Sequence, residues 1–109
     1  MQEKKPDEKL VYVTVGSRLE AEKIADAVVV EKLAACANLL PGVRSVFEWQ
    51  GKICREEEVV LILKTVAGRM EKLTDRIKEL HSYECPCIVY FSIDGGNPDF
   101  LSWIADSLK

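Results

Sequence analysis

The apolar run Val59-Val60-Leu61-Ile62-Leu63 limits the possible folds more than any other feature, because no polar residue alternates with its apolar ones. Such a run predicts a strand that is covered on both faces. The turn signal Gln50-Gly51-Lys52 precedes it, and a β-branched and aromatic stretch, 43–49, precedes the turn. These segments predict a long hairpin of strands 34–49 and 53–64, with a kink or bulge at Pro41-Gly42 and a polar tip.

Two amphipathic helices are predicted on either side of this hairpin. After a first strand at 10–15, Ser17-Arg18-Leu19-Glu20 matches a capping box, which begins a helix that runs to about Leu33. The predicted inward face of this helix holds Ala21, Ile24, Ala25 and Val28. A second helix that ends near His81 is predicted by apolar residues at three- and four-residue spacing, namely Met70, Leu73, Ile77 and Leu80.

A last strand is predicted at 88–91, and a terminal helix begins at Asn97-Pro98-Asp99, where asparagine is a good cap and proline suits the first helical position. The order β-α-β-β-α-β plus a helix is the ferredoxin-like α+β sandwich. Both long helices then cover one sheet face, and a terminal helix of about 11 residues, roughly 16 Å long, is too short to cover the other. We therefore expect a second copy of the chain to bury that face.

The length and charge of the chain exclude several classes of protein. Its 109 residues predict a single domain, residues 10–109, after a flexible charged tail at 1–9. A formal charge of -3 with no dense basic patch argues against nucleic acid as a partner, and no apolar stretch suits a membrane span or a signal peptide. Without a secretion signal, the four cysteines are expected as reduced thiols, which predicts a cytoplasmic protein.

The segment His81-Ser82-Tyr83-Glu84-Cys85-Pro86-Cys87 joins the second helix to the last strand and has two interpretations. In one, His81 stabilises the helix end, Tyr83 packs, and the cysteines are small inert apolar residues. In the other, Cys85 and Cys87 lie on one face of the strand, about 6.6 Å apart at roughly 3.3 Å per residue. With His81 they would then bind a soft or borderline metal such as copper, although the Cys-x-x-Cys spacing is absent.

Several segments, EKLAACANLLPGVRSVFEWQGKI, EEVVLILKT, KELHSYECPCIV and GNPDFLSWI, together resemble the CutA divalent-cation-tolerance family over nearly the whole chain. The resemblance implies a ferredoxin-like subunit that assembles into a tight, PII-like homotrimer. It also implies a cytoplasmic protein that is not an enzyme, has no obligatory cofactor and is linked to tolerance of copper and other divalent metals. The ligands it implies are metal ions or a small molecule at clefts between subunits.

The family pattern matches this chain at Cys36, Trp49, Gly51, Lys52, Glu58, Lys64, His81, Tyr83 and Pro86. Of these, Trp49, Lys52, Glu58, Lys64 and Tyr83 are the candidate cleft residues, and His81, Cys85 and Cys87 the candidate metal ligands. Members usually have proline where Ser82 stands, and a glutamate or small residue at Cys87. Metal ligands credited to some members fall here on Val15, Leu80 and His81, so two of those three are lost.

Other interpretations remain open at this point. Trp49 suits packing at a subunit contact as well as ligand binding. Lys64 in an apolar strand needs a partner, for which Glu58 or a neighbouring subunit's carboxylate is expected. Gly16-Ser17-Arg18 at a helix start has the donors for a phosphate, as in an acylphosphatase-like hydrolase, but is also explained as a turn and a cap. A metallochaperone and a purely structural or signalling trimer are the remaining alternatives.

Overall fold

Four antiparallel strands form one sheet in the order β2-β3-β1-β4. The computed structural model describes residues 7–109. Along the chain the elements are β1 (Glu8–Val15), α1 (Arg18–Val30), β2 (Cys36–Trp49), β3 (Lys52–Val66), a 3₁₀ turn (Ala67–Arg69), α2 (Met70–Leu80), β4 (Ile88–Ser92) and α3 (Pro98–Ser107). This order confirms the predicted ferredoxin-like α+β fold with an added C-terminal helix.

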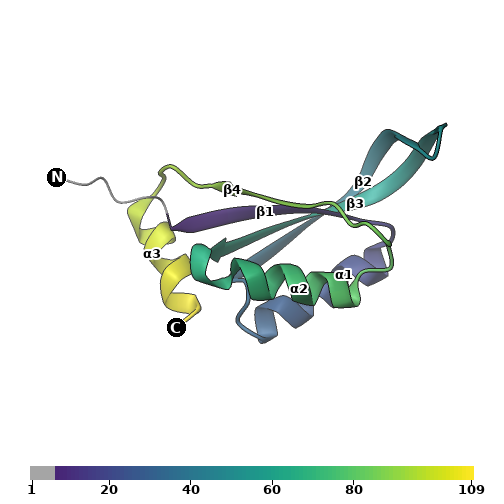
Figure 1. The fold of residues 1–109 in the computed structure, drawn as a ribbon. Coiled ribbons are helices and arrows are strands. Elements are labelled where there is room, and N and C mark those ends of the chain that lie inside the picture. Colours follow the sequence, from purple (N-terminus) through teal and green to yellow (C-terminus); the bar gives the residue numbers. More distant parts are fainter. Residues whose placement is uncertain (1–6) are drawn as a thin grey trace.

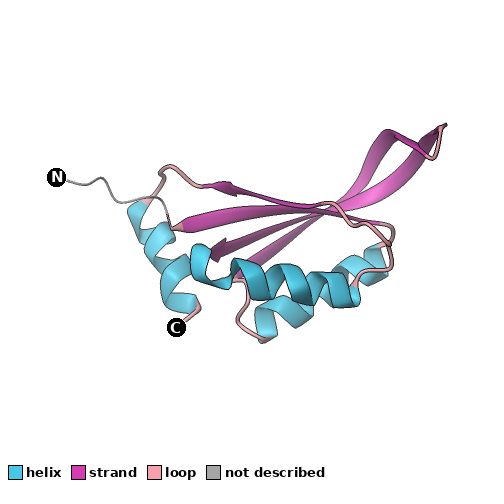
Figure 2. Ribbon diagram, viewed as in Figure 1, coloured by secondary structure: helices cyan, strands magenta, loops and turns pink. Residues whose placement is uncertain are grey.

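The two long helices lie side by side against one face of the sheet, below it in Figure 1, and the other face carries no helix over its length (Figure 2). The core lies between these layers. All four residues predicted for the inward face of α1 are buried, as are Met70, Leu73 and Ile77 of α2. They pack against alternate strand residues, namely Val11, Val13, Val15, Leu61 and Leu63.

The strand residues that alternate with this core form a second apolar surface, which we call the open sheet face. Side chains alternate along a strand, so Ile62, between the buried Leu61 and Leu63, points away from the helices. The strand register places Tyr12 beside Ile62 and Val89 beside Tyr12. The apolar members of the open sheet face are Leu10, Tyr12, Leu40, Val60, Ile62, Val89 and Phe91. Phe91 is 57% exposed, so a single subunit leaves this face only partly covered.

The β2-β3 hairpin projects beyond the helical layer, at the upper right of Figure 1. The predicted irregularity at Pro41-Gly42 is confirmed, because the register of β2 against β3 shifts between Leu40 and Val43. At the tip, Gln50 and Gly51 both have positive φ, 52° and 80°, as a two-residue type I′ turn requires. A hairpin of this length therefore carries its outer half away from the core.

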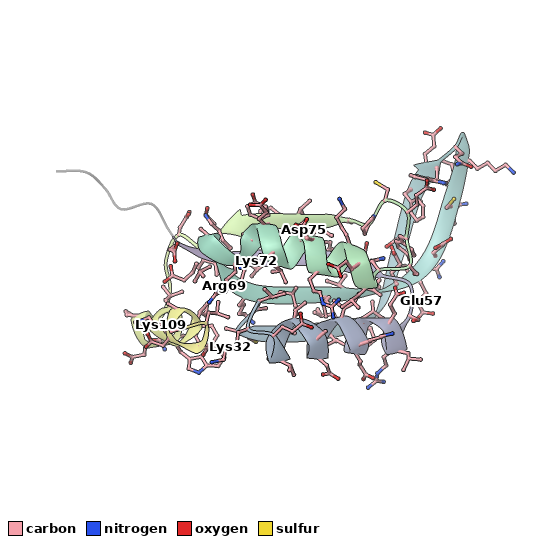
Figure 3. The ribbon with its side chains drawn as sticks, turned by 60° about the horizontal axis from the view of Figure 1, so that its bottom comes forward. Lys32, Glu57, Arg69, Lys72, Asp75 and Lys109 are labelled. Carbon is pink, nitrogen blue, oxygen red and sulfur yellow. The ribbon has the colours of Figure 1, made fainter. Side chains whose placement is uncertain are left out.

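The C-terminal helix crosses the end of the sheet and contacts β1 and β3. Asn97 caps it as predicted, its side chain accepting from the Asp99 N–H at 3.0 Å. Ile104 and Leu108 are buried. At the other end the Arg69 guanidinium donates to the Leu108 carbonyl, and Lys32 Nζ donates to the Lys109 carbonyl at 3.3 Å, an arrangement that satisfies terminal helix carbonyls (Figure 3).

Two predicted boundaries, the start of the first strand and the end of the first helix, are wrong. The first strand begins at Glu8, so Glu8 and Lys9 belong to the sheet and not to the predicted tail, whose residues 1–6 lie outside the described part. Helix α1 ends at Val30, three residues early, and Lys32 just beyond it adopts a left-handed φ of 58°. Strand β4 begins at Ile88 as predicted, so the interpretation that places Cys85 and Cys87 on one strand face is wrong.

No helix within residues 7–109 has the length and apolar character needed to span a membrane.

Candidate functional site

A cavity of about 590 Å³ opens between the outer half of the hairpin and the segment that joins α2 to β4. We call it the hairpin cavity. The strands contribute Thr14, Ser45, Val46, Phe47, Trp49, Glu56 and Glu58 to its wall, and the connecting segment contributes Tyr83, Glu84, Cys85 and Cys87. Two strand carboxylates face this cavity because Glu56 and Glu58 are two residues apart on β3 and share one strand face. The outer hairpin therefore meets the cysteine-bearing segment here.

His81 fixes the start of the connecting segment. Its side chain is fully buried, and its Nε2 lies 2.8 Å from the carbonyl oxygen of Thr14, to which it donates. Its Nδ1 accepts from the Tyr83 N–H at 3.1 Å. This pair of bonds selects the neutral tautomer with the proton on Nε2. Because both ring nitrogens are used within the protein, a metal would have to displace one of these bonds to reach His81.

Ser82 and Tyr83 supply two more links to the sheet and to α1. Ser82 Oγ donates to Glu20 Oε2 at 3.1 Å, near the start of α1. Tyr83 Oη donates to Glu58 Oε2 at 2.8 Å. Together with His81, these bonds hold three consecutive residues against β1, α1 and β3, so the segment approaches the cavity from a fixed position.

Glu58, which lines the cavity, is a buried carboxylate that is only 6% exposed. Within residues 7–109, no Lys, Arg or His side chain pairs with it, and the Tyr83 hydroxyl is its side-chain hydrogen-bond partner. Burial and the hydrogen bond to the Glu58 carboxylate raise the pKa of the Tyr83 phenol above its ordinary value. The phenol therefore stays protonated and keeps donating at neutral pH.

Gly16 leaves room for the Tyr83 ring. A Cβ at this position would lie 3.0 Å from Tyr83 Oη and 3.3 Å from Tyr83 Cε1. We expect Gly16→Ala to lower the free energy of unfolding by about 1 kcal/mol, because the tightly held ring must shift. Gly68→Ala is the matched control, since a Cβ there meets nothing within 4 Å. Urea unfolding at one protein concentration measures both, and equal losses would contradict this account.

The hairpin cavity carries negative charge and sulfur but no cationic side chain among its lining residues. Glu56, Glu58 and Glu84 supply three carboxylates, and the exposed Cys85 and Cys87 supply two free thiols. Carboxylates and thiolates are ligands for cations, the thiolates for soft ions. No three His, Cys, Asp or Glu side chains in the described chain stand together as a ready-made metal site. Among the residues that line the cavity, the cysteine pair is thus the soft donor set.

The structure gathers five of the predicted site residues and separates three. Trp49, Glu58, Tyr83, Cys85 and Cys87 all line the hairpin cavity. Lys52 is exposed beside the hairpin turn, paired in register with Trp49. His81 lies behind Tyr83, with their ring centroids 4.7 Å apart. Lys64 lies six residues along β3 from Glu58, a separation of about 20 Å along a strand.

The expected pairing of Lys64 with Glu58 is wrong. Lys64 Nζ donates to Asn38 Oδ1 at 2.5 Å, and it lies 3.7 Å from Cys36 Sγ and 6.0 Å from the centre of the Phe100 ring. None of these contacts, which are those within residues 7–109, is with a carboxylate. Lys64 is half-buried and reaches the end of the sheet, where an amide oxygen and an aromatic ring accommodate its charge.

Gly16-Ser17-Arg18 forms the predicted start of α1. Ser17 Oγ caps α1 by accepting from the Glu20 N–H at 3.2 Å, and Arg18 Nε lies 3.4 Å from Glu22 Oε1. These contacts match the predicted helix cap.

The sequence-based site lacked six cavity residues, namely Thr14, Ser45, Val46, Phe47, Glu56 and Glu84. Glu56 belongs to the charged run 55–58, which is typical of a solvated face, but its two-residue spacing from Glu58 was the available signal. Phe47 has the same spacing from Trp49 on β2. Glu84 lies in the irregular segment between α2 and β4. The path of such a segment cannot be predicted from the spacing of apolar residues.

Comparisons with known proteins agree over nearly the whole chain. Residues 9–107 match the model of a family described as CutA1 divalent ion tolerance protein. The chain is 41% identical over 100 residues to the divalent-cation tolerance protein CutA of Thermus thermophilus, across 92% of this chain and 97% of that protein. It is also 41% identical over 100 residues to the chloroplastic protein CutA of Arabidopsis thaliana, across 92% of this chain but only 55% of that protein.

A solved structure of CutA from Archaeoglobus fulgidus, described as a periplasmic divalent cation tolerance protein, superposes with a TM-score of 0.90. It is 38% identical to this chain and covers 94% of it, and the chain covers 99% of that structure.

Proposed function

The chain belongs to the CutA1 divalent ion tolerance family, and we propose from this premise that it binds a metal ion at the hairpin cavity as a cytoplasmic homotrimer. Copper is the metal that we propose first. The observation that carries the proposal is the composition of the cavity wall, which has three carboxylates and two exposed thiols and no cationic side chain.

The buried carboxylate supports a cationic ligand. Glu58 has a neutral phenol as its hydrogen-bond donor, so the negative charge of this 6% exposed group is stabilised but not neutralised. A buried charge without a countercharge is costly, and a bound cation would relieve that cost. Glu56 and Glu84 on the same wall strengthen the attraction.

The two thiols support a soft metal. Thiolates favour Cu(I), which accepts low coordination numbers, so a cysteine pair is an adequate donor set for it. Cys85 and Cys87 are both exposed, so they are not buried packing residues. A harder divalent ion would also bind if another subunit placed a further carboxylate or thiol at this cavity.

The open sheet face supports the trimer. It presents Ile62, Tyr12 and Phe91 on the side of the sheet that α1 and α2 leave uncovered, and apolar surface of this extent favours association. In a cyclic assembly every subunit buries the same apolar face, so no copy leaves it in contact with water. We propose that the hairpin cavity then lies at a cleft between subunits, since the hairpin projects beyond its own helical layer.

A binding role is proposed in preference to catalysis. Residues 16–18, on which the acylphosphatase-like alternative rests, are explained as the start of α1, where Ser17 Oγ accepts from the Glu20 N–H and Arg18 Nε contacts Glu22. A second candidate ligand is a small organic cation, which the exposed Trp49 and the neighbouring Phe47 favour by offering aromatic faces beside the carboxylates.

The cytoplasm is the proposed compartment because all four cysteines are free thiols.

The test is the Cu(I) affinity of the reduced protein, measured in competition with a chromogenic chelator. We expect Cys85→Ser and Cys87→Ser each to lower the affinity at least about tenfold, which corresponds to roughly 1.4 kcal/mol. The matched control is Cys54→Ser, because Cys54 lies on β3 near the hairpin tip and does not line the cavity. Affinity should also fall at lower pH, since thiols must lose protons to bind metal.

Equal affinities for the wild type and both cavity variants would overturn the copper site. If Cys54→Ser or Cys36→Ser lowered the affinity instead, the metal would bind at a different thiol. Tight binding of tetramethylammonium with no Cu(I) binding would replace the proposal by the organic-cation alternative.

A further inference from the structure

Cys85 and Cys87 are close enough along the chain to form a bond. Two trans peptide steps place their Cα atoms at most about 7 Å apart, and disulfides accept Cα separations of roughly 4.4–6.8 Å. In a regular strand, side chains two residues apart run parallel, so their Cβ atoms stay wider apart than the roughly 3.5–4.5 Å that a disulfide requires. The backbone must therefore bend locally for the sulfurs to meet.

The structure leaves the backbone of this pair out of the sheet. Strand β4 begins at Ile88, one residue after Cys87, so the ladder with β1 does not hold residues 85–87 straight. Pro86 between the cysteines has no N–H and could not donate to a ladder in any case. A bend at this point breaks no strand hydrogen bond, and the bonds of His81, Ser82 and Tyr83 keep the preceding residues in place.

The other two cysteines are held elsewhere. Cys36 contacts Asn38 and lies 3.7 Å from Lys64 Nζ, at the end of the sheet opposite to the hairpin tip. Cys54 lies on β3, with its thiol 3.9 Å from the Lys52 carbonyl oxygen. Cys85 and Cys87 are both exposed and both face the hairpin cavity. They are therefore the two cysteines of the cavity wall, and both are open to a small oxidant.

We infer that Cys85 and Cys87 form a reversible disulfide, which switches the hairpin cavity from a soft-metal site to one for hard cations. A small-molecule disulfide such as oxidised glutathione is the oxidant. One cysteine thiolate attacks it and releases one glutathione thiolate, and the second cysteine then attacks the mixed disulfide and releases the other. The protein loses two electrons and two protons, and two glutathione thiols are formed.

The consequence for the cavity follows from what oxidation removes. A disulfide offers no thiolate, so the soft donor pair is lost, while Glu56, Glu58 and Glu84 keep their carboxylates. Intracellular disulfides are usually transient and redox-sensing, which suits a pair on an exposed irregular segment. The switch in metal preference rests on the proposed function, but the formation of the disulfide does not.

The experiment titrates the reduced 109-residue chain with buffers of increasing ratio of oxidised to reduced glutathione. Intact mass spectrometry without reductant should show the loss of two hydrogen atoms, and fragmentation should place the link between Cys85 and Cys87. The double variant Cys36→Ser/Cys54→Ser should behave like the wild type, because it keeps the pair. In the Cys85→Ser variant, Cys87 should instead carry one glutathione or remain a free thiol. Cu(I) affinity of the oxidised wild type should fall at least about tenfold, to the level of the Cys85→Ser variant.

Any of three results would overturn the inference: a stable mixed disulfide with glutathione on the wild type, a disulfide between two chains, or four free thiols in the most oxidising buffer. The two proposals fail separately. If the reduced protein binds no Cu(I) but the intramolecular link forms, the proposed copper site fails and the disulfide stands. If reduced protein binds Cu(I) through Cys85 and Cys87 and no link forms, only the switch fails.

Discussion

Leu61→Asp should leave the chain unfolded, whereas Ile62→Asp should leave the subunit folded and prevent its assembly. The two residues are neighbours on β3 but point to opposite sides of the sheet. Leu61 is 0% exposed and packs in the core between the sheet and the two helices. An unpaired charge there costs several kcal/mol on top of the lost packing, which is comparable to the whole stability of a small domain, about 5–15 kcal/mol.

Ile62 lies on the open sheet face and is only half-buried in one subunit. Its aspartate variant can keep the new charge in water as a monomer, so the cost appears when a second copy covers the face. Light scattering at micromolar concentration should find a wild-type trimer and a monomeric Ile62→Asp variant, while circular dichroism finds both folded. Val30→Asp is the control, because Val30 is 81% exposed on α1, away from the open sheet face.

A trimeric Ile62→Asp variant would show that another surface holds the assembly. A stable wild-type monomer would contradict the proposed homotrimer outright. A folded Leu61→Asp variant would contradict the assignment of Leu61 to the core. Because assembly stabilises the folded chain by mass action, all variants must be compared at the same concentration.

The predicted fold was accurate because its signals are local and repeated. Apolar residues at three- and four-residue spacing placed the inward faces of α1 and α2, and all of them are buried except Leu80, which is half-buried. Turn and cap residues placed the hairpin tip and the start of α3. Boundaries were less predictable, since one backbone conformation such as that of Lys32 ends a helix without a marked sequence signal.

The candidate site was predictable only in part because it depends on register. Trp49, Glu58 and Tyr83 were identified from the resemblance to a family, and they meet because β2, β3 and the connecting segment converge. Lys64 shows the limit of sequence reasoning. The need for a partner was correctly inferred, but choosing Asn38 over Glu58 requires the β2-β3 pairing, which places Asn38 opposite Ile62 and Cys36 opposite Lys64.

The metal ligands illustrate a different limit. His81 is spaced suitably from Cys85 in the sequence, yet its ring nitrogens are committed to Thr14 and Tyr83. A spacing argument cannot detect such commitments, because the Thr14 carbonyl is 67 residues away. His81 therefore has a structural role at the start of the segment, and the proposed metal ligands are the cysteines further along it.

Tyr83→Phe should destabilise the folded chain by about 2–3 kcal/mol at neutral pH. The change removes the hydroxyl that donates to Glu58 Oε2 and leaves a buried carboxylate without that donor, and hydrogen bonds to charged groups contribute about this much. Tyr90→Phe is the matched control, because Tyr90 is 55% exposed on the edge strand β4 and should change stability little. Urea unfolding at fixed protein concentration measures both.

The loss of folding stability caused by Tyr83→Phe should also depend on pH, and it should become smaller at high pH. The folded-state pKa of the Tyr83 phenol is raised by burial and by Glu58 above the ordinary value of 10.0, which approximates the unfolded chain. The unfolded state therefore releases the phenol proton first, so the stabilisation is complete below pH 10 and is lost as pH rises towards the folded-state pKa. The difference between wild type and Tyr83→Phe should be constant from pH 7 to 9 and shrink above pH 10, while other tyrosines and lysines titrate alike in both proteins. A difference that grows above pH 10 would mean that the phenolate, and not the phenol, is favoured beside Glu58, and would contradict the hydrogen bond on which the geometry of the hairpin cavity depends.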